Sequence, residues 1–104
     1  MRSASHAKAR RTFFARSFQG NAEYAAFLAA LLQRQGRNEE AIEQFHAALA
    51  LRPGSGVWWL GLGMSLQATN RPAAAQEAYR QARAAGNLQP DLEALAVQRL
   101  KQLQ

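Results

Sequence analysis

Apolar positions along the chain recur with the period of α-helices. From residue 22 onward they lie three and four positions apart, the spacing that places side chains on one face of a helix. Four such runs precede a fifth near the C-terminus, so the pattern predicts an all-α fold. The first four runs contain Tyr24, Leu28, Leu31 and Leu32; Ile42, Phe45 and Leu49; Trp58, Trp59, Leu62 and Leu66; and Ala75, Ala78, Tyr79 and Ala82.

Helix-breaking residues separate these runs. Gly36 follows the first run, Pro53 and Gly54 follow the second, Asn70 the third and Gly86 the fourth. Glycine and asparagine tolerate the left-handed backbone conformation that closes many helices, and proline disrupts a helix interior. Each break therefore predicts the turn between two helices.

Residues that favour helix starts lie where the next runs begin. Ser55 occupies an N-cap position, and Asn21 occupies the corresponding place before the first run. Pro72 fits a first helical turn, where its missing N–H is harmless. A fifth helix is predicted over residues 91–103, with acidic residues in its first turn and basic residues near its end, as the helix macrodipole favours. Its apolar face consists of Leu92, Leu95, Ala96, Leu100 and Leu103.

The sequence contains an internal repeat. Aligning residues 22–55 with residues 56–89, an offset of 34, requires no gap and pairs identical residues at many positions. The identical pairs are Leu28 with Leu62, Leu32 with Leu66, Gln33 with Gln67, Arg37 with Arg71, Ala41 with Ala75, Glu43 with Glu77, Ala48 with Ala82 and Ala50 with Ala84. Each unit therefore reads as one pair of helices.

The period and the residue types of these units resemble the tetratricopeptide repeat. In the second unit the resemblance rests on Trp59, Leu62, Gly63, Leu66, Ala75, Tyr79 and Ala82, and in the first on Leu28, Ala29, Leu32, Gly36, Ala41, Phe45, Ala48 and Pro53. Alanine replaces the tryptophan in the first unit, leucine replaces tyrosine in both, and the closing proline of the second arrives late, at Pro90. The resemblance implies an all-α helical solenoid, with repeats at 22–55 and 56–89, a capping helix at 91–103 and an N-terminal helix.

In such repeats the two helices cross closely where both carry small residues. Gly63 and Ala29 are expected there, opposite Ala75 and Ala41, so that packing offsets the poor helix propensity of glycine. Gly56 is interpreted as a helix-start residue. Nothing in the repeat pattern requires a small residue at the position of Gly61, so this glycine stays unexplained. The residues expected to pack the repeats are Leu28, Ala29, Leu32, Ala41, Phe45, Ala48, Trp59, Leu62, Gly63, Leu66, Ala75, Tyr79 and Ala82.

The run from Gly56 to Thr69 is apolar nearly all round, which leaves Val57, Leu60 and Met64 with no partner inside the repeat pattern. The family resemblance places them on the concave surface and implies a groove for a peptide or a partner helix. The predicted groove residues are Ala26, Phe27, Ala30, Gln33, Val57, Leu60, Met64 and Gln67. A second interpretation stays open, in which the final helix, the N-terminal arm or another copy of the chain covers this strip. The row lacks the Lys, Asn and Arg with which some members clamp a peptide carboxylate.

The net charge of +6 resides mostly in the N-terminal arm, residues 1–20, which holds five basic residues and no acidic one. The body, residues 21–104, is close to neutral. Interleaved with the arginines are Phe13, Phe14 and Phe18, so one interpretation is a contact for nucleic acid or an anionic surface. The favoured interpretation is the second helix of a truncated earlier repeat, whose rings cap the apolar edge of the first unit.

The residues give little support to enzyme chemistry, and we expect no catalytic residue, metal or cofactor. The chain has no cysteine, and His6 and His46 lie far apart with no metal-binding spacing around them. The acidic group Glu39, Glu40 and Glu43 reads as a solvated helix start. No apolar run approaches the roughly 20 residues that span a bilayer, although an anchor or export signal could precede this sequence.

A narrower resemblance concerns residues 33–90 and the closing LEALAVQRLKQL, which look like the C-terminal repeats of MshN-type proteins. Those bacterial proteins take part in biogenesis of the mannose-sensitive haemagglutinin pilus, a type IV pilus. The resemblance implies a periplasmic domain of a protein anchored in the inner membrane; without it, a cytoplasmic location is expected. The expected partner is a protein or peptide rather than a small molecule, nucleic acid is less favoured, and the apolar edges allow homo-oligomers.

Overall fold

A computed structural model describes residues 20–104 of the chain, and the described part is built from helices with no strand. This confirms the predicted all-α helical repeat fold. Three predictions for the N-terminal arm concern residues that lie almost wholly outside the described part: a helix, a cap on the first unit, and a basic contact for nucleic acid.

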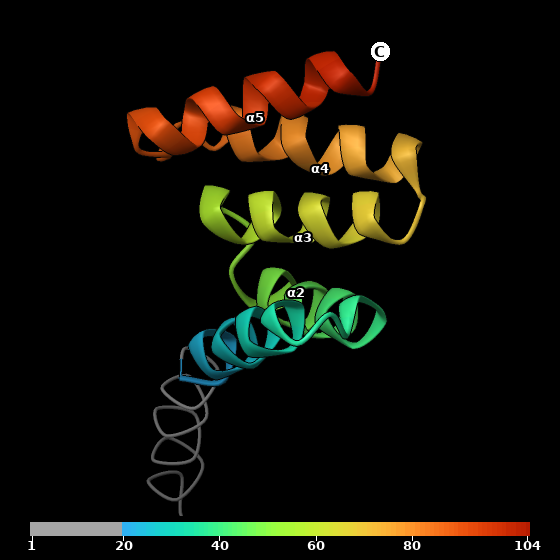
Figure 1. Cartoon of the computed structure of the whole chain (residues 1–104). Coiled ribbons are helices and arrows are strands. Elements are labelled where there is room, and N and C mark those ends of the chain that lie inside the picture. The colour runs from blue at the N-terminus through green and yellow to red at the C-terminus, as the bar shows by residue number, and fades with distance from the viewer. Residues whose placement is uncertain (1–19) are drawn as a thin grey trace, which may run out of the picture.

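The helices follow one another through short turns. The chain is helical over residues 20–34, which we call the first helix, and then forms α2 (Asn38–Leu51), α3 (Gly56–Ala68), α4 (Pro72–Ala84) and α5 (Pro90–Gln102). The main contacts join consecutive helices, α2 with α3, α3 with α4, and α4 with α5. Figure 1 shows the result as a stack that rises from the first helix and α2 to α5.

The predicted turn residues close the helices. Gly36, Asn70 and Gly86 have φ angles of 77°, 61° and 73°, the left-handed conformation that glycine and asparagine adopt most easily. The Trp58 amide donates to Ser55 Oγ over 3.3 Å, so Ser55 caps α3 as predicted. The prediction for Asn21 is wrong, because the helix already includes residue 20.

The core runs along the stack between the helices. Tyr79 is fully buried, and all but two of the predicted packing residues are buried. The exceptions, Leu28 and Trp59, are half-buried against the same core. The apolar face predicted for the first helix is partly wrong, because Tyr24 is 67% exposed and Leu31 is 39% exposed. These two side chains lie at the end of the stack, where no described helix covers them.

The close helix crossing in the second repeat differs in detail from the prediction. A Cβ added to Gly63 would lie 2.7 Å from Cε1 of Tyr79, so the tyrosine ring rather than an alanine occupies the space beside this glycine. Gly56 is more than a helix start. Its Cβ would lie 2.5 Å from Oδ1 of Asn87 and 2.9 Å from the Ala82 carbonyl oxygen, and its amide donates to that same Oδ1.

Candidate peptide-binding groove

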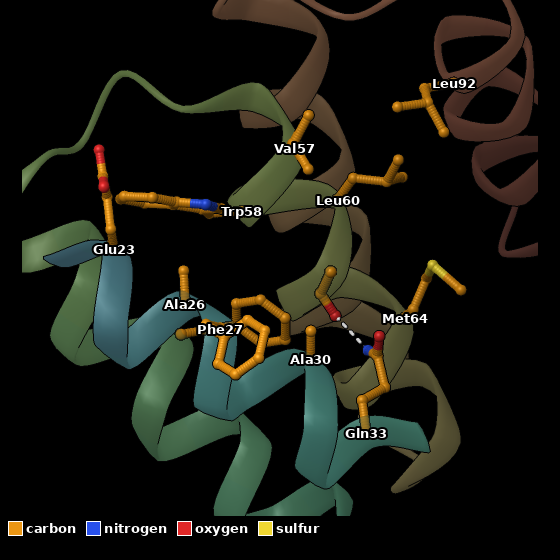
Figure 2. A pocket seen from close by; sticks show the side chains of 12 residues that line it. Glu23, Ala26, Phe27, Ala30, Gln33, Val57, Trp58, Leu60, Met64 and Leu92 are labelled. Carbon is orange, nitrogen blue, oxygen red and sulfur yellow. Dashed lines mark hydrogen bonds between the residues drawn. The ribbon is translucent and has the colours of Figure 1, made fainter.

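A groove with a volume of about 410 Å³ lies between the first helix and α3. Most of its walls are apolar, and Figure 2 shows the side chains of the two helices facing each other across it. Its lining residues are Glu23, Ala26, Phe27, Ala30, Gln33, Phe45, Val57, Trp58, Leu60, Gly61, Met64 and Leu92.

Small residues give the groove its depth. Ala26 and Ala30 lie one turn apart on the first helix, and Gly61 lies on the opposing α3. A Cβ on Gly61 would lie 2.5 Å from Cζ of Phe45, a core residue of α2. The structure therefore supplies the reason for Gly61 that the repeat pattern lacked, since only glycine leaves room for this ring.

The apolar groove residues differ in how far they reach solvent. Phe27 is 64% exposed and Val57 is 50% exposed, so both present apolar surface on opposite walls. Met64 is half-buried. Leu60, which the repeat pattern alone left without a partner, is only 3% exposed and belongs to the core. Leu60 contributes to the base of the groove but cannot offer a partner much surface.

A hydrogen-bond network fixes one polar position of the groove. The Gln33 side-chain amide donates to the Gly61 carbonyl oxygen over 2.9 Å and to Ser65 Oγ over 2.8 Å. Ser65 is fully buried, and its hydroxyl donates to Oδ1 of Asn38 over 3.0 Å. The network ties the first helix and α2 to α3 and holds the two groove walls at a fixed separation.

Charge and aromatic surface meet at another position, near Glu23. Arg52 Nη2 lies 3.3 Å from Oε1 of Glu23, and its Cζ lies 5.1 Å from the centroid of the Trp58 ring. The guanidinium can interact favourably with both the carboxylate and the aromatic face. Trp58 itself packs against Ala25, Ala26 and Ala48, so the groove here combines an acid with an indole.

The observed groove lining differs from the predicted one at Gln67 and at Leu92. Gln67 is not part of the lining: its Oε1 accepts from the Tyr79 hydroxyl over 2.7 Å and from Arg99 over 3.2 Å. Leu92 of α5, predicted only for the apolar face of its own helix, lines the groove instead. The final helix thus borders the groove, in line with the interpretation that this helix lies near the apolar strip. It does not fill the groove, which keeps a volume of about 410 Å³.

Sequence reasoning also left Phe45 and Trp58 out of the groove, because each reads as a packing residue at its helical spacing. Both do pack the core, and part of each ring nevertheless lines the groove. The adjacent pair Trp58 and Trp59 was one sequence signal for an aromatic ring outside the core. Neighbouring residues on a helix point in different directions, so the two rings cannot both lie on the face that packs the core. Trp59 donates its indole N–H to the Pro53 carbonyl oxygen over 2.8 Å.

The titratable groups with shifted pKa values lie outside the groove lining. Arg37 pairs with Glu40 and holds the pKa of that carboxyl below its usual range, while Arg71 pairs with Glu39 over 2.7 Å. The acidic residues at the start of α2 are therefore exposed, as predicted, and two of them, Glu39 and Glu40, also form ion pairs. Burial raises the pKa of Tyr79, and the charge of Arg99 opposes this shift.

Within residues 20–104, no cluster of three His, Asp or Glu side chains is placed to hold a metal ion. In the same residues, every buried side-chain nitrogen and oxygen has a hydrogen-bond partner. No helix of this part combines the length and the apolar character needed to cross a bilayer. What the groove can offer a ligand is therefore mainly apolar surface.

Comparison with known proteins gives one family. A family model described as tetratricopeptide repeat matches residues 20–87. This range includes the first helix, α2, α3 and α4, and both walls of the groove. No curated protein matches the chain.

Proposed function

Because this chain belongs to the tetratricopeptide repeat family, whose members generally mediate protein–protein interactions, we propose that it is a non-enzymatic scaffold that binds an apolar peptide or helix. Binding occurs in the groove between the first helix and α3, within a repeat domain over residues 21–104. The single observation that carries this proposal is the exposure of Phe27 and Val57 on facing walls of one apolar groove. Apolar surface that stays in water at a concave site commonly marks a binding site.

The lining indicates the chemistry of the ligand. Ala26 and Ala30 leave space for side chains that project between the two walls, and Met64 offers an adaptable thioether contact. An amphipathic helix with apolar residues at i, i+3, i+4 and i+7 would place its apolar face in such a groove. The groove volume of about 410 Å³ is enough for a few such side chains.

The narrower setting in which this binding takes place is also a proposal. The resemblance of residues 33–90 to MshN-type proteins supports a role in assembling a type IV pilus or related secretion machinery, in the bacterial periplasm. A partner subunit with an apolar segment fits the groove that the structure presents. Binding of nucleic acid or an anionic surface through residues 1–20 remains the alternative prediction, and residues 1–19 lie outside the described part of the chain.

A matched pair of variants tests the groove. Phe27 and Tyr24 lie on the same helix with almost equal exposure, 64% and 67%, but only Phe27 lines the groove. The probe is a synthetic amphipathic peptide with leucine at the four helical positions named above, titrated against the full chain. Tryptophan fluorescence provides the readout, because Trp58 lines the groove. Phe27→Ser should weaken binding about tenfold, as expected for loss of a buried aromatic contact, and Tyr24→Ser should leave it within about twofold.

Three controls accompany this experiment: a scrambled peptide, circular dichroism of both variants, and a comparison of low and moderate salt. A scrambled peptide of the same composition should not bind, and circular dichroism should show both variants to be as helical as the parent chain. Equal loss of binding in the two variants, or none in either, would contradict the groove. Binding that falls steeply between low and moderate salt would favour the basic arm instead, because phosphate-like contacts depend strongly on ionic strength.

A further inference from the structure

The side-chain amide of Gln33 uses its nitrogen and its oxygen unequally. Nε2 donates to the Gly61 carbonyl oxygen over 2.9 Å and to Ser65 Oγ over 2.8 Å, whereas no donor among residues 20–104 bonds to Oε1. Every buried side-chain oxygen in this part of the chain has a partner, so Oε1, which has none there, is not buried. Since Gln33 lines the groove, this oxygen is an acceptor that a bound ligand can reach.

Neighbouring groups fix the orientation of this amide. The Gly61 carbonyl oxygen can only accept, so the nitrogen of Gln33 rather than its oxygen must face it. Ser65 requires the same orientation, because its hydroxyl donates to Oδ1 of Asn38 over 3.0 Å and therefore accepts from Gln33. Asn38 is oriented in turn by the Gly36 carbonyl oxygen, to which its Nδ2 donates over 3.4 Å. Oε1 of Gln33 is thus held in place as the acceptor at the end of this chain of hydrogen bonds.

The second repeat shows what the same oxygen does where donors lie within reach. The 34-residue offset maps Gln33 onto Gln67. Oε1 of Gln67 accepts from the Tyr79 hydroxyl over 2.7 Å and from Arg99 Nη1 over 3.2 Å. A glutamine at this position of the repeat can therefore accept two side-chain hydrogen bonds.

The first repeat has neither of these two donors. Phe45 occupies the position of Tyr79 and has no hydroxyl. Ser65 occupies the position of Arg99, because α3 and α5 coincide at the 34-residue offset. The Ser65 hydroxyl is already directed at Asn38. The first repeat therefore keeps the acceptor, and its described residues lack the side chains that satisfy this acceptor in the second repeat.

We propose that Gln33 determines the specificity of the groove by accepting a hydrogen bond from an uncharged hydroxyl or amide side chain of the partner segment. This inference rests on the proposed groove function. The surroundings favour an uncharged donor: Ala30, Phe45 and Met64 also line the groove, and Figure 2 shows the Gln33 amide between Ala30 and Met64. Glu23, the charged residue of the lining, is ten residues away along the first helix, about 15 Å. A cation beside Gln33 would lose hydration without a counter-charge nearby.

The acceptor makes the groove selective in both directions. An apolar side chain placed against Oε1 of Gln33 would remove its water and leave the oxygen unsatisfied, which is unfavourable. A hydroxyl or amide at the same place would replace that water with a direct hydrogen bond. The preferred partner is therefore an apolar segment with one uncharged donor at the end that meets Gln33.

Four versions of the amphipathic leucine peptide test this preference. Each keeps leucine at three of the four apolar positions and carries threonine or valine at the first or the last. Threonine and valine have nearly the same shape, but only threonine has a hydroxyl, and both ends are varied because either can meet Gln33. The peptides are titrated against the full chain by tryptophan fluorescence. At one end the threonine peptide should bind about fivefold more tightly than the valine peptide, as expected for one hydrogen bond.

A matched pair of variants assigns this preference to Gln33. Gln33→Met replaces the amide with an apolar side chain of similar length, so threonine should no longer bind more tightly than valine. Gln67→Met makes the same substitution at the equivalent position outside the groove lining, and it should keep the preference. Circular dichroism should show both variants to be as helical as the parent chain. The readout is a ratio of two affinities, so a loss of stability that weakens both peptides equally does not change it.

Two outcomes would overturn the proposal and leave the groove function standing, provided that the all-leucine peptide binds. One is valine binding as tightly as threonine at both ends, which the parent chain alone reveals even if Gln33→Met does not fold. The other is a threonine preference that survives Gln33→Met, because the hydroxyl would then donate to another residue. If neither the all-leucine peptide nor any of the four versions binds, the groove function fails and this inference fails with it.

Discussion

The ring of Phe45 occupies the space that a side chain at Gly61 would need: a Cβ there would lie 2.5 Å from its Cζ atom. Phe45 belongs to α2 and Gly61 to α3, so this contact joins the two repeats rather than the helices of one repeat. The ring cannot easily move away, because Phe45 is buried in the core. A glycine that weakens its own helix thereby permits the stacking of two helix pairs.

Replacing Gly61 by alanine should therefore destabilise the protein. Helix propensity would favour alanine by about 1 kcal/mol, whereas overpacking against a fixed ring costs about 1–3 kcal/mol. We expect a net loss of about 1 kcal/mol in the free energy of unfolding, measured by urea denaturation. The control is Gly54→Ala, since a Cβ there would have no neighbour within 4 Å. A Gly61→Ala protein as stable as the parent would show that the ring has room to shift.

Substitution by aspartate should have different effects at the two groove residues Val57 and Leu60: loss of peptide binding at Val57 and loss of stability at Leu60. Val57→Asp places a carboxylate at a half-exposed position, so we expect a folded protein that no longer binds the amphipathic peptide. Leu60→Asp would bury an unpaired carboxylate in the core, and we expect it to lose about 3–5 kcal/mol of stability. Thermal melts followed by circular dichroism distinguish the two.

Leu51→Asp is the control for this pair, because Leu51 is exposed and outside the groove lining. It should keep both the fold and peptide binding. If Val57→Asp binds as well as Leu51→Asp does, that wall of the groove is not part of the site.

The Gln33–Ser65 hydrogen bond should contribute to stability as a coupled pair. Ser65→Ala removes the acceptor of Gln33 Nε2 and the donor to Asn38 in a fully buried position, so we expect a loss of about 1–2 kcal/mol. Gln33→Ala removes one of the same bonds. A double-mutant cycle should give a coupling energy of about 1 kcal/mol, measured by urea denaturation. Strictly additive losses would show that the two side chains act independently.

Tyr79 should make the stability fall at alkaline pH. Burial raises the pKa of Tyr79 in the folded protein above the value of about 10 of an unfolded chain. The folded state thus favours the neutral phenol. Its contribution is fully present below pH of about 10 and is lost as the pH rises through the folded pKa. Unfolding free energies measured on both sides of this range should show the decline.

Tyr79→Phe separates this effect from general alkaline unfolding. At neutral pH it should cost about 1 kcal/mol through the lost bond to Gln67, and the difference from the parent should shrink as the pH rises. Tyr24→Phe should retain the full alkaline decline, because Tyr24 is exposed. That variant leaves Tyr79 as the only tyrosine of the chain, so the tyrosinate absorbance reports its ionisation directly. An alkaline decline in Tyr79→Phe equal to that of the parent would contradict this assignment.

Periodicity and breaking residues were enough to predict the helices, because each signal is local. Gly36 and Asn70 end helices through their own backbone preference, and Ser55 caps α3 through an atom of its own side chain. The register of the two units followed from identical residues at one offset. None of these inferences needs the position of another helix.

Several groove and packing predictions failed where the role of a residue depends on a side chain of another helix. Gly61 depends on Phe45, which is 16 residues earlier in the chain and invisible to a helical pattern. Leu60 and Gln67 lie on α3, which is apolar nearly all round, so periodicity does not say which side meets the core. Leu60 turned out buried, and Gln67 bonds to Tyr79 and Arg99. Only the packed arrangement distinguishes groove from core on such a helix.

The order of contacts along the stack also bears on how the chain folds. Its main helix contacts are those of α2 with α3, α3 with α4, and α4 with α5, so each can form after closing only a short loop. Low contact order of this kind is typical of chains that fold within microseconds to milliseconds. Folding can begin at any neighbouring pair and spread outward, and a weakened end helix such as α5 should detach while the rest of the stack remains assembled.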